Sequence, residues 1–147
     1  MFKNVLVPTD GSKLSMKAVD KAIEFSVATG AGLTLMTVIP PYAVMAAGDG
    51  YVLEPISSEA WDKVMKDRAE KILAAAEKRA KAKGLSVQLM FVRNSLAYDG
   101  IIAAAKKRKC DLIIMASHGR RGLSALLLGS ETTKVLTHST IPVLVCR

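Results

Sequence analysis

Short apolar runs alternate along this chain with longer stretches in which apolar residues recur at helical spacing. The runs predict strands over residues 5–7, 31–39, 85–92, 112–115 and 141–145. The periodic stretches predict helices over residues 12–30, 58–84, 97–109 and 130–138, and residues 42–57 are expected to form a long loop. Because parallel neighbours need crossover connections, this alternation predicts an α/β fold, a doubly wound parallel sheet of five strands with helices on both faces.

Individual residues indicate where these elements begin, end and pack. Ser12 is expected to cap the first helix, and Gly84 to follow the last turn of the longest helix as a C′ glycine. The buried stripe of that longest helix is expected to consist of Met65, Ala69, Ile72 and Ala76. Residues 112–115 are continuously apolar, which is typical of a strand covered on both faces. Pro142 has no N–H to donate to a ladder, so the last strand is expected at an edge of the sheet.

Length and composition limit what the chain can be. With 147 residues, of which 50% are hydrophobic, it is expected to form one domain over residues 1–147. No apolar run approaches the roughly 20 residues that span a bilayer, and the N-terminus leaves no room for a signal peptide. We therefore expect a cytoplasmic protein with no membrane partner. The two cysteines, Cys110 and Cys146, form no C-x-x-C pair and are expected to be reduced thiols at the ends of buried strands.

The formal net charge of +8 raises the question of a nucleic-acid partner. The basic residues are spread along the predicted helices and gather near their C-termini, as in residues 78–83 and 106–109, where cations favour the helix dipole. Aromatic residues that could stack on bases are scarce. We therefore expect no nucleic-acid partner, and a polyanionic small molecule fits the charge equally well.

Two segments follow predicted strands at the edge where a parallel sheet binds its ligands. The first is residues 8–12, and the second is residues 115–122, which continue to the start of the last helix. Glycines in the second segment let backbone amides approach an oxyanion, and a helix N-terminus favours negative charge. The residues expected at this phosphate site are Gly119, Arg120, Arg121, Gly122 and Ser130. The alternative is that these glycines only form turns, because neither a Walker A nor a G-x-G-x-x-G pattern occurs.

Two polar residues in these segments have more than one interpretation. Asp10 follows a strand directly, so it either forms a turn or caps a helix, or it contacts a ligand. His118 is expected to shape its loop or to lie beside a phosphate, since no carboxylate partner or second histidine at ligand spacing accompanies it. Thr9, Ser12 and Ser117 form no recognisable pair of nucleophile and base, so we expect no catalytic residue and no protein-bound metal.

The second segment also carries a longer motif. Residues Ala116-x2-Gly119-x9-Gly129-Ser130 match the pattern G-x2-G-x9-G-[ST] except at the first position. With the opening VLVPTDGS and the closing IPVLV, the whole chain resembles the universal stress protein family. This resemblance implies a five-stranded parallel sheet in the order 3-2-1-4-5, a homodimer, and ATP as the bound cofactor, with Mg²⁺ entering only on the ATP.

The resemblance also implies a role for individual residues. Asp10 would lie near the ribose and Val38 against the adenine, while Pro8 and Thr9 shape the first loop. The phosphates would be held by Gly119, Gly129, Ser130 and Thr132. The full nucleotide-binding set is predicted to be Pro8, Thr9, Asp10, Val38, Met115, Ala116, His118, Gly119, Arg120, Gly122, Gly129, Ser130, Glu131 and Thr132.

The chain departs from the family pattern at two places. Residues 94–96 are Asn-Ser-Leu where relatives often have Gly-Asp/Glu-Pro, and Ala116 stands where the motif has its first glycine. A glycine at position 116 could serve a positive φ or provide room for the ligand. Because the preceding strand continues smoothly into Ala116, we expect an extended residue whose methyl group crowds the ligand and weakens ATP binding about tenfold.

The function expected from these features is regulatory. ATP would shift the conformation or the partner choice of a stress-response protein rather than serve as a substrate. The homodimer would form through the C-terminal strand, because an open apolar edge at residues 143–145 would otherwise promote aggregation. A slow ATPase and a nucleotide-free dimeric interaction module are the alternatives.

Overall fold

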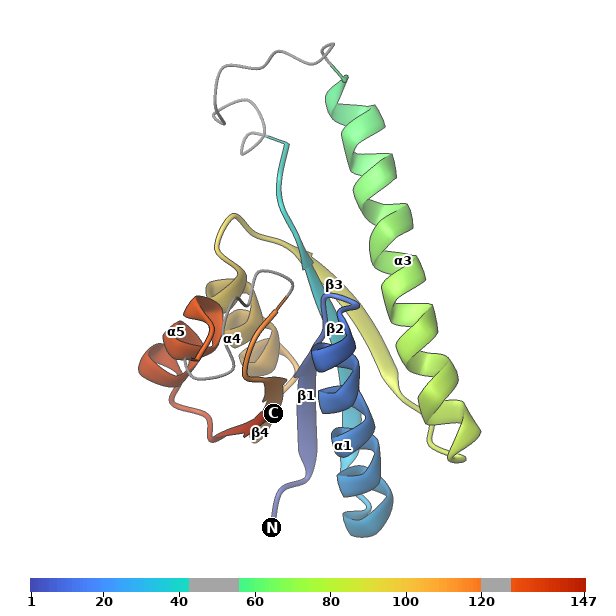
Figure 1. Cartoon of the computed structure of the whole chain (residues 1–147), viewed down its shortest axis with the longest axis vertical. Helices are drawn as coiled ribbons and strands as arrows, with labels where there is room; N and C mark the ends of the chain where they lie inside the picture. Colours follow the sequence, from blue (N-terminus) through green and yellow to red (C-terminus); the bar gives the residue numbers. More distant parts are fainter. Residues whose placement is uncertain (43–55, 120–127) are drawn as a thin grey trace.

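A single parallel sheet in the order β3-β2-β1-β4-β5 organises the computed structural model, which describes residues 1–42, 56–119 and 128–147 (Figure 1). The strands are β1 (Asn4–Pro8), β2 (Gly32–Ile39), β3 (Gln88–Arg93), β4 (Leu112–Ala116) and β5 (Val143–Cys146). The helices of the described residues are α1 (Lys13–Thr29), α3 (Ser58–Ala82), α4 (Ala97–Lys107) and α5 (Ser130–His138). Every strand pair is parallel, so the predicted topology is confirmed.

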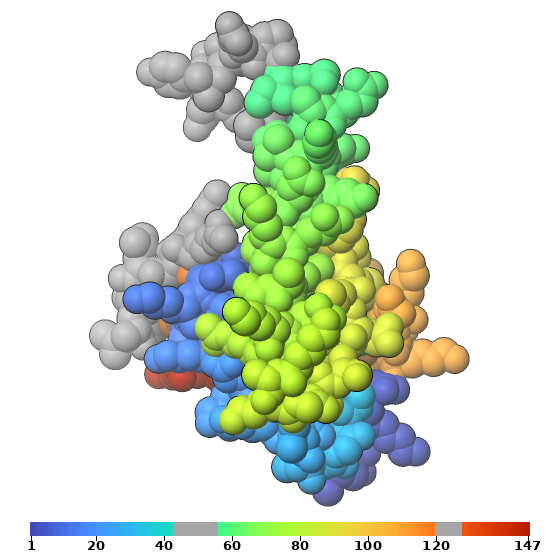
Figure 2. Space-filling model, turned by 90° about the vertical axis from the view of Figure 1, so that its right-hand side faces the viewer, coloured from blue at the N-terminus to red at the C-terminus, as the bar shows by residue number. Residues whose placement is uncertain are grey.

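The helices cover both faces of this sheet, as a doubly wound fold requires. Helices α1 and α3 lie on one face, and α4 and α5 lie on the other (Figure 1). Alternation along β1 supplies both cores, because Val5 and Val7 pack under α1 and α3 while Leu6 packs under α4 and α5. Figure 2 shows α3 crossing the length of its face beside α1. The two faces are therefore closed by separate apolar layers.

The end of α3 corrects two predictions. The third strand begins at Gln88 and not at residue 85, because Leu85 donates its N–H to the carbonyl of Ala80 and so belongs to the helix cap. Gly84 follows the helix with φ 72°, which confirms the predicted C′ glycine. Ile72 is only half-buried, because Leu73 lies in line with the buried residues of this helix and takes its place in the core.

Other predictions concern the edges of the sheet and the cysteines. Pro142 precedes β5, which lies at one edge of the sheet as predicted, and β3 forms the other edge. Cys110 is buried before β4, Cys146 is half-buried at the end of β5, and they form no disulfide. Burial raises the pKa of both thiols. None of the described helices is long and apolar enough to cross a membrane. Most of the predicted loop at 42–57 lies outside the described residues.

Candidate functional site

A cavity of about 490 Å³ opens at the carboxyl ends of β1, β2 and β4. The strand order reverses between β1 and β4, which is the place where open parallel sheets bind ligands. The N-termini of α4 and α5 complete the wall. The lining residues are Pro8, Thr9, Asp10, Ser15, Thr37, Val38, Ser95, Ala97, Ile101, Met115, Ala116, His118, Gly119, Gly129, Ser130, Glu131 and Thr132. Two loops and two helix N-termini therefore share one cavity.

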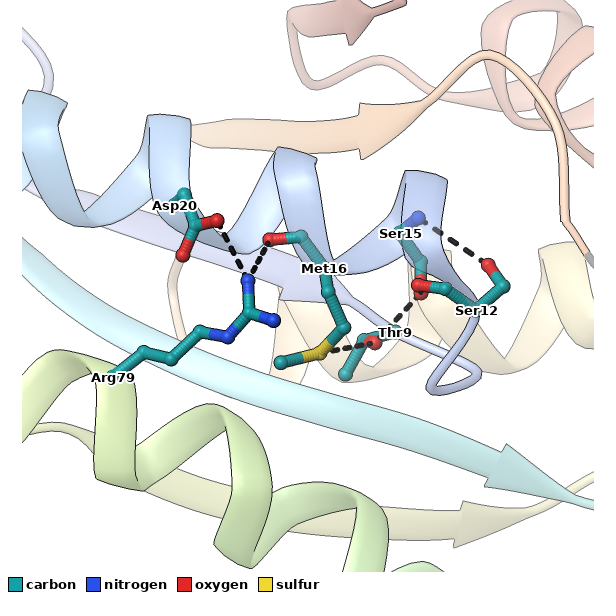
Figure 3. Close-up of polar contacts among 6 residues, drawn as sticks. All are labelled: Thr9, Ser12, Ser15, Met16, Asp20 and Arg79. Atoms are coloured by element: carbon teal, nitrogen blue, oxygen red, sulfur yellow. Dashed lines mark hydrogen bonds and ion pairs between the residues drawn. The ribbon is translucent and has the colours of Figure 1, made fainter.

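The loop after β1 is fixed by hydrogen bonds within the chain. The Asp10 Oδ1 atom accepts a hydrogen bond from the Ser12 N–H at 2.9 Å, so Asp10 forms the turn that precedes α1. Ser12 caps α1 by accepting from the Ser15 N–H at 3.3 Å, which confirms the predicted N-cap. The hydroxyl groups of Thr9 and Ser15 lie 2.9 Å apart beneath the loop (Figure 3). Asp10 is thus a turn former that also faces the cavity, and its contact with a ligand stays a prediction.

The side chain of Arg79, on α3, holds α1 in place. Arg79 Nη1 lies 2.6 Å from Asp20 Oδ2 and 3.3 Å from the Met16 carbonyl oxygen, as Figure 3 shows. Both charged side chains are nearly half exposed, so the pair contributes at most about 1 kcal/mol. The Thr9 hydroxyl contacts the sulfur of the same Met16 at 3.6 Å (Figure 3). The two contacts of Arg79 therefore link α3 to α1, the helix that follows the first loop.

The start of α5 is fastened to the end of β4. The Gly129 N–H donates to the Ser117 carbonyl at 2.8 Å, and the Thr132 hydroxyl donates to the Ala116 carbonyl at 2.9 Å. A Cβ atom on Gly129 would lie 3.1 Å from the Ser117 oxygen and 3.2 Å from the Cα atom of His118. Because both of those atoms belong to backbone, a side chain at position 129 would push α5 away from β4. Gly129 therefore has a packing role in this wall, independent of any ligand.

The N-terminus of α5 differs from those of α1 and α3. Those two helices are capped by serine side chains, Ser12 and Ser57, whereas α5 begins after Gly129, which has no side chain to act as a cap. The first amides of a helix have no partner inside the helix. At α5 they lie at the cavity wall with Ser130 and Glu131. The positive end of a helix dipole, together with amides that receive no side-chain cap from Gly129, makes this part of the cavity suitable for an anion.

A close contact joins the loops that follow β1 and β4. A Cβ atom on Gly119 would lie 3.0 Å from Asp10 Oδ2, so the absence of a side chain lets the two loops approach.

Ala116 is a buried part of the cavity wall. It is 6% exposed and pairs with Cys146 in the ladder between β4 and β5. Ala116 is not among the positive-φ residues, so the prediction of an extended conformation is confirmed. Its methyl group therefore affects the space in the cavity and not the backbone.

His118 and Ser117 lie next to each other at the end of β4. The Ser117 hydroxyl is 2.9 Å from His118 Nδ1, and Ser117 is 1% exposed. A serine this deeply buried is inaccessible as a nucleophile, and its bond to the imidazole fixes the ring in the loop. His118 Nε2 is buried and has no hydrogen-bond partner within the described ranges. This hydrogen bond fits a loop-shaping role for His118, and the alternative that the ring lies beside a phosphate stays a prediction.

The structure brings together every predicted site residue that it describes. Those from the first loop, β2, β4 and the start of α5 all line the one cavity, and whether they bind a nucleotide stays a prediction. Arg120 and Gly122, together with Arg121, lie outside the described residues. Sequence reasoning missed Ser15, Thr37, Ser95, Ala97 and Ile101, which also line it. Ser95 lies in the segment 94–96, which departs from the family pattern, but the sequence did not indicate that this segment lines the cavity.

The whole chain is similar to known proteins. A model of the universal stress protein family matches residues 1–147. Universal stress protein YxiE of Bacillus subtilis is 34% identical over 150 residues, which cover 100% of each chain. The solved structure of protein MJ0577, from Methanocaldococcus jannaschii, superimposes with a TM-score of 0.81 at 26% identity and covers 99% of this chain and 95% of its own.

A second solved structure bears on the ligand. It is a universal stress protein in complex with cAMP, with a TM-score of 0.71 and 29% identity. The match covers 99% of this chain and 97% of that one. This chain is thus similar, over its whole length, to a protein that holds an adenine nucleotide.

Proposed function

This chain belongs to the universal stress protein family, and we propose that it binds an adenine nucleotide, ATP in particular, as a regulatory ligand. The observation that carries this proposal is the N-terminus of α5, which has no side-chain cap at Gly129 and lies at the wall of the cavity between β1 and β4. Backbone amides at a helix N-terminus bind phosphate without needing a basic side chain. The cAMP complex of a similar protein supports an adenine nucleotide as the ligand class.

The rest of the wall suits the remaining parts of a nucleotide. Val38, Ile101 and Met115 give one side of the cavity an apolar surface against which a purine ring can lie. The Asp10 carboxylate is an acceptor, and ribose hydroxyl groups are donors. Gly119 has no side chain, so the loop after β4 comes close to that carboxylate. In this arrangement the base lies toward β2 and α4, the sugar near the first loop, and the phosphate at α5.

Binding without turnover fits the side chains at this site better than hydrolysis. Ser117 is too deeply buried to serve as a nucleophile, and its hydrogen bond to Nδ1 of His118 holds the imidazole in the loop. Within the described ranges, no cluster of three or more His, Cys, Asp or Glu side chains could hold a metal ion. Magnesium would therefore enter on the phosphates of ATP. ATP then acts by stabilising one conformation or one assembly over another.

The same proposal includes a homodimer formed through β5. This strand lies at an edge of the sheet and carries Leu144, which is 47% exposed. Open apolar edges are templates for pairing with another chain, and a two-fold axis would pair β5 with its own copy.

The purified protein should carry its ligand. We expect acid extraction of desalted protein, followed by chromatography and mass spectrometry, to recover ATP. The last desalting wash, extracted in parallel, is the control for unbound nucleotide. Recovery of ADP together with phosphate release on adding ATP would replace this proposal with a slow ATPase. No extracted nucleotide and no binding of added ATP would leave a nucleotide-free interaction module.

A further inference from the structure

Glu131 places a negative charge at the wall of the cavity that the proposed function assigns to a nucleotide. It lies in the first turn of α5, beside the amides that would bind phosphate. Among the lining residues that the structure describes, the carboxylates are Asp10 and Glu131, and Asp10 belongs to the other loop. A carboxylate next to a phosphate site opposes the attraction of the helix N-terminus.

The Glu131 carboxylate is held in place by contacts with α4 and α5. Its Oε2 atom accepts a hydrogen bond from the Tyr98 N–H at 2.9 Å, in the first turn of α4. Its Oε1 atom lies 3.3 Å from Nζ of Lys134, one turn along α5. The Lys134 ammonium also lies over the Tyr98 ring, 5.6 Å from its centroid. These contacts hold the charge at the wall instead of leaving it to swing into solvent.

The contact with Tyr98 gives the side chain of Glu131 a structural role. Helix α4 begins after Leu96, which offers no side-chain cap, so the carboxylate of Glu131 serves as an acceptor for the start of α4. A neutral amide oxygen could accept the same hydrogen bond. The negative charge is therefore separable from the structural contact, and its effect on a ligand can be tested alone.

We propose that Glu131 disfavours the highly charged forms of an adenine nucleotide in this cavity, so that free ATP binds less well than ATP in its magnesium complex. The inference rests on the proposed function. The amides of α5 attract the phosphate and the carboxylate in the same helical turn repels it, and this repulsion grows with the negative charge of the ligand. A cyclic monophosphate carries a single negative charge, whereas a free triphosphate carries several. A divalent cation on the triphosphate lowers its net charge, so ATP is accepted as its magnesium complex and discriminated against when free.

The size of the effect follows from the surroundings of the charge. The side chains of Glu131 and Lys134 are 43% and 44% exposed, so solvent screens them and Lys134 offsets part of the repulsion. The expected discrimination between free ATP and cAMP due to this charge is about three- to tenfold. It should shrink in magnesium and in high salt.

The test compares Glu131→Gln with the unchanged protein by calorimetric titration of ATP and cAMP, in EDTA at low salt. We expect the ratio of the ATP Kd to the cAMP Kd to fall about three- to tenfold in Glu131→Gln. The fall should largely disappear in high salt. A change that was only structural would alter both affinities alike and would not depend on salt.

Lys134→Met is the matched variant, because it removes the cation beside the same carboxylate. We expect its ratio of the ATP Kd to the cAMP Kd to rise, which is the opposite of the change in Glu131→Gln. This variant still tests the proposal if Glu131→Gln fails to fold. Ratios that stay unchanged in both variants while both ligands bind would overturn the charge selection and leave the proposed function intact. If neither ligand binds the unchanged protein, the proposed function fails and this inference fails with it.

Discussion

Replacing Gly129 with valine is expected to weaken ATP binding about a hundredfold and to lower the free energy of unfolding by about 1–3 kcal/mol. The reason lies in the backbone around Gly129. A Cβ atom there would already lie 3.1 Å from the Ser117 carbonyl oxygen, and the added methyl groups would push α5 from β4. The amides proposed to bind phosphate would move with the helix. Calorimetry with ATP and denaturation in urea measure the two effects separately.

Ala116→Gly is the control for this variant, because it removes a methyl group from the same wall. Ala116 is extended and buried, so the substitution creates space and relieves no strain. We expect ATP to bind about tenfold tighter and the protein to lose about 0.5–1 kcal/mol of stability, as glycine costs in a strand. A Gly129→Val protein that binds ATP as the unchanged protein does would contradict the placement of the phosphate at α5.

Replacing Leu144 with lysine is expected to convert the proposed homodimer into a monomer. Leu144 lies in the middle of the edge strand β5 and is 47% exposed in the single chain, so a charge there meets its own copy across the two-fold axis. Val143 is a poorer choice, because it packs against the core under α4 and α5 and a lysine there would damage the fold. Light scattering at micromolar protein gives the mass directly.

Leu89→Lys is the matched variant at the opposite edge of the sheet. Leu89 lies on β3 and is 37% exposed, so it presents a comparable apolar side chain on the other open edge. We expect this variant to keep the dimer mass. A monomeric unchanged protein would contradict the proposed assembly, and so would a dimer that survives Leu144→Lys but is lost in Leu89→Lys.

The order of strands and helices could be predicted because it depends on local pattern. Buried strands such as residues 112–115 are continuously apolar, and crossover rules leave parallel topologies as the main choice. The order 3-2-1-4-5 came from the family resemblance, while the edge position of β5 followed from Pro142 alone. Local pattern could not predict that β3 begins at Gln88, because Leu85, which precedes it, belongs to the cap of α3.

The site was predictable to the extent that it consists of loops following strands. The segments around Asp10 and Gly119 were identified for that reason, and they lie against each other in the structure. Residues such as Thr37 and Ile101 look like ordinary strand and helix positions, so only the packing of α4 over β2 reveals that they line the cavity. The contact between Glu131 and Tyr98 spans two helices, and no local pattern encodes it.

The most direct test of the central claim is a pair of calorimetric titrations, one with ATP in magnesium and one with adenosine. Both ligands present the same base and sugar to the cavity, and only ATP brings phosphate to the N-terminus of α5. The account predicts that ATP binds at least about tenfold more tightly than adenosine. Equal affinities, or the absence of binding by both ligands, would contradict it.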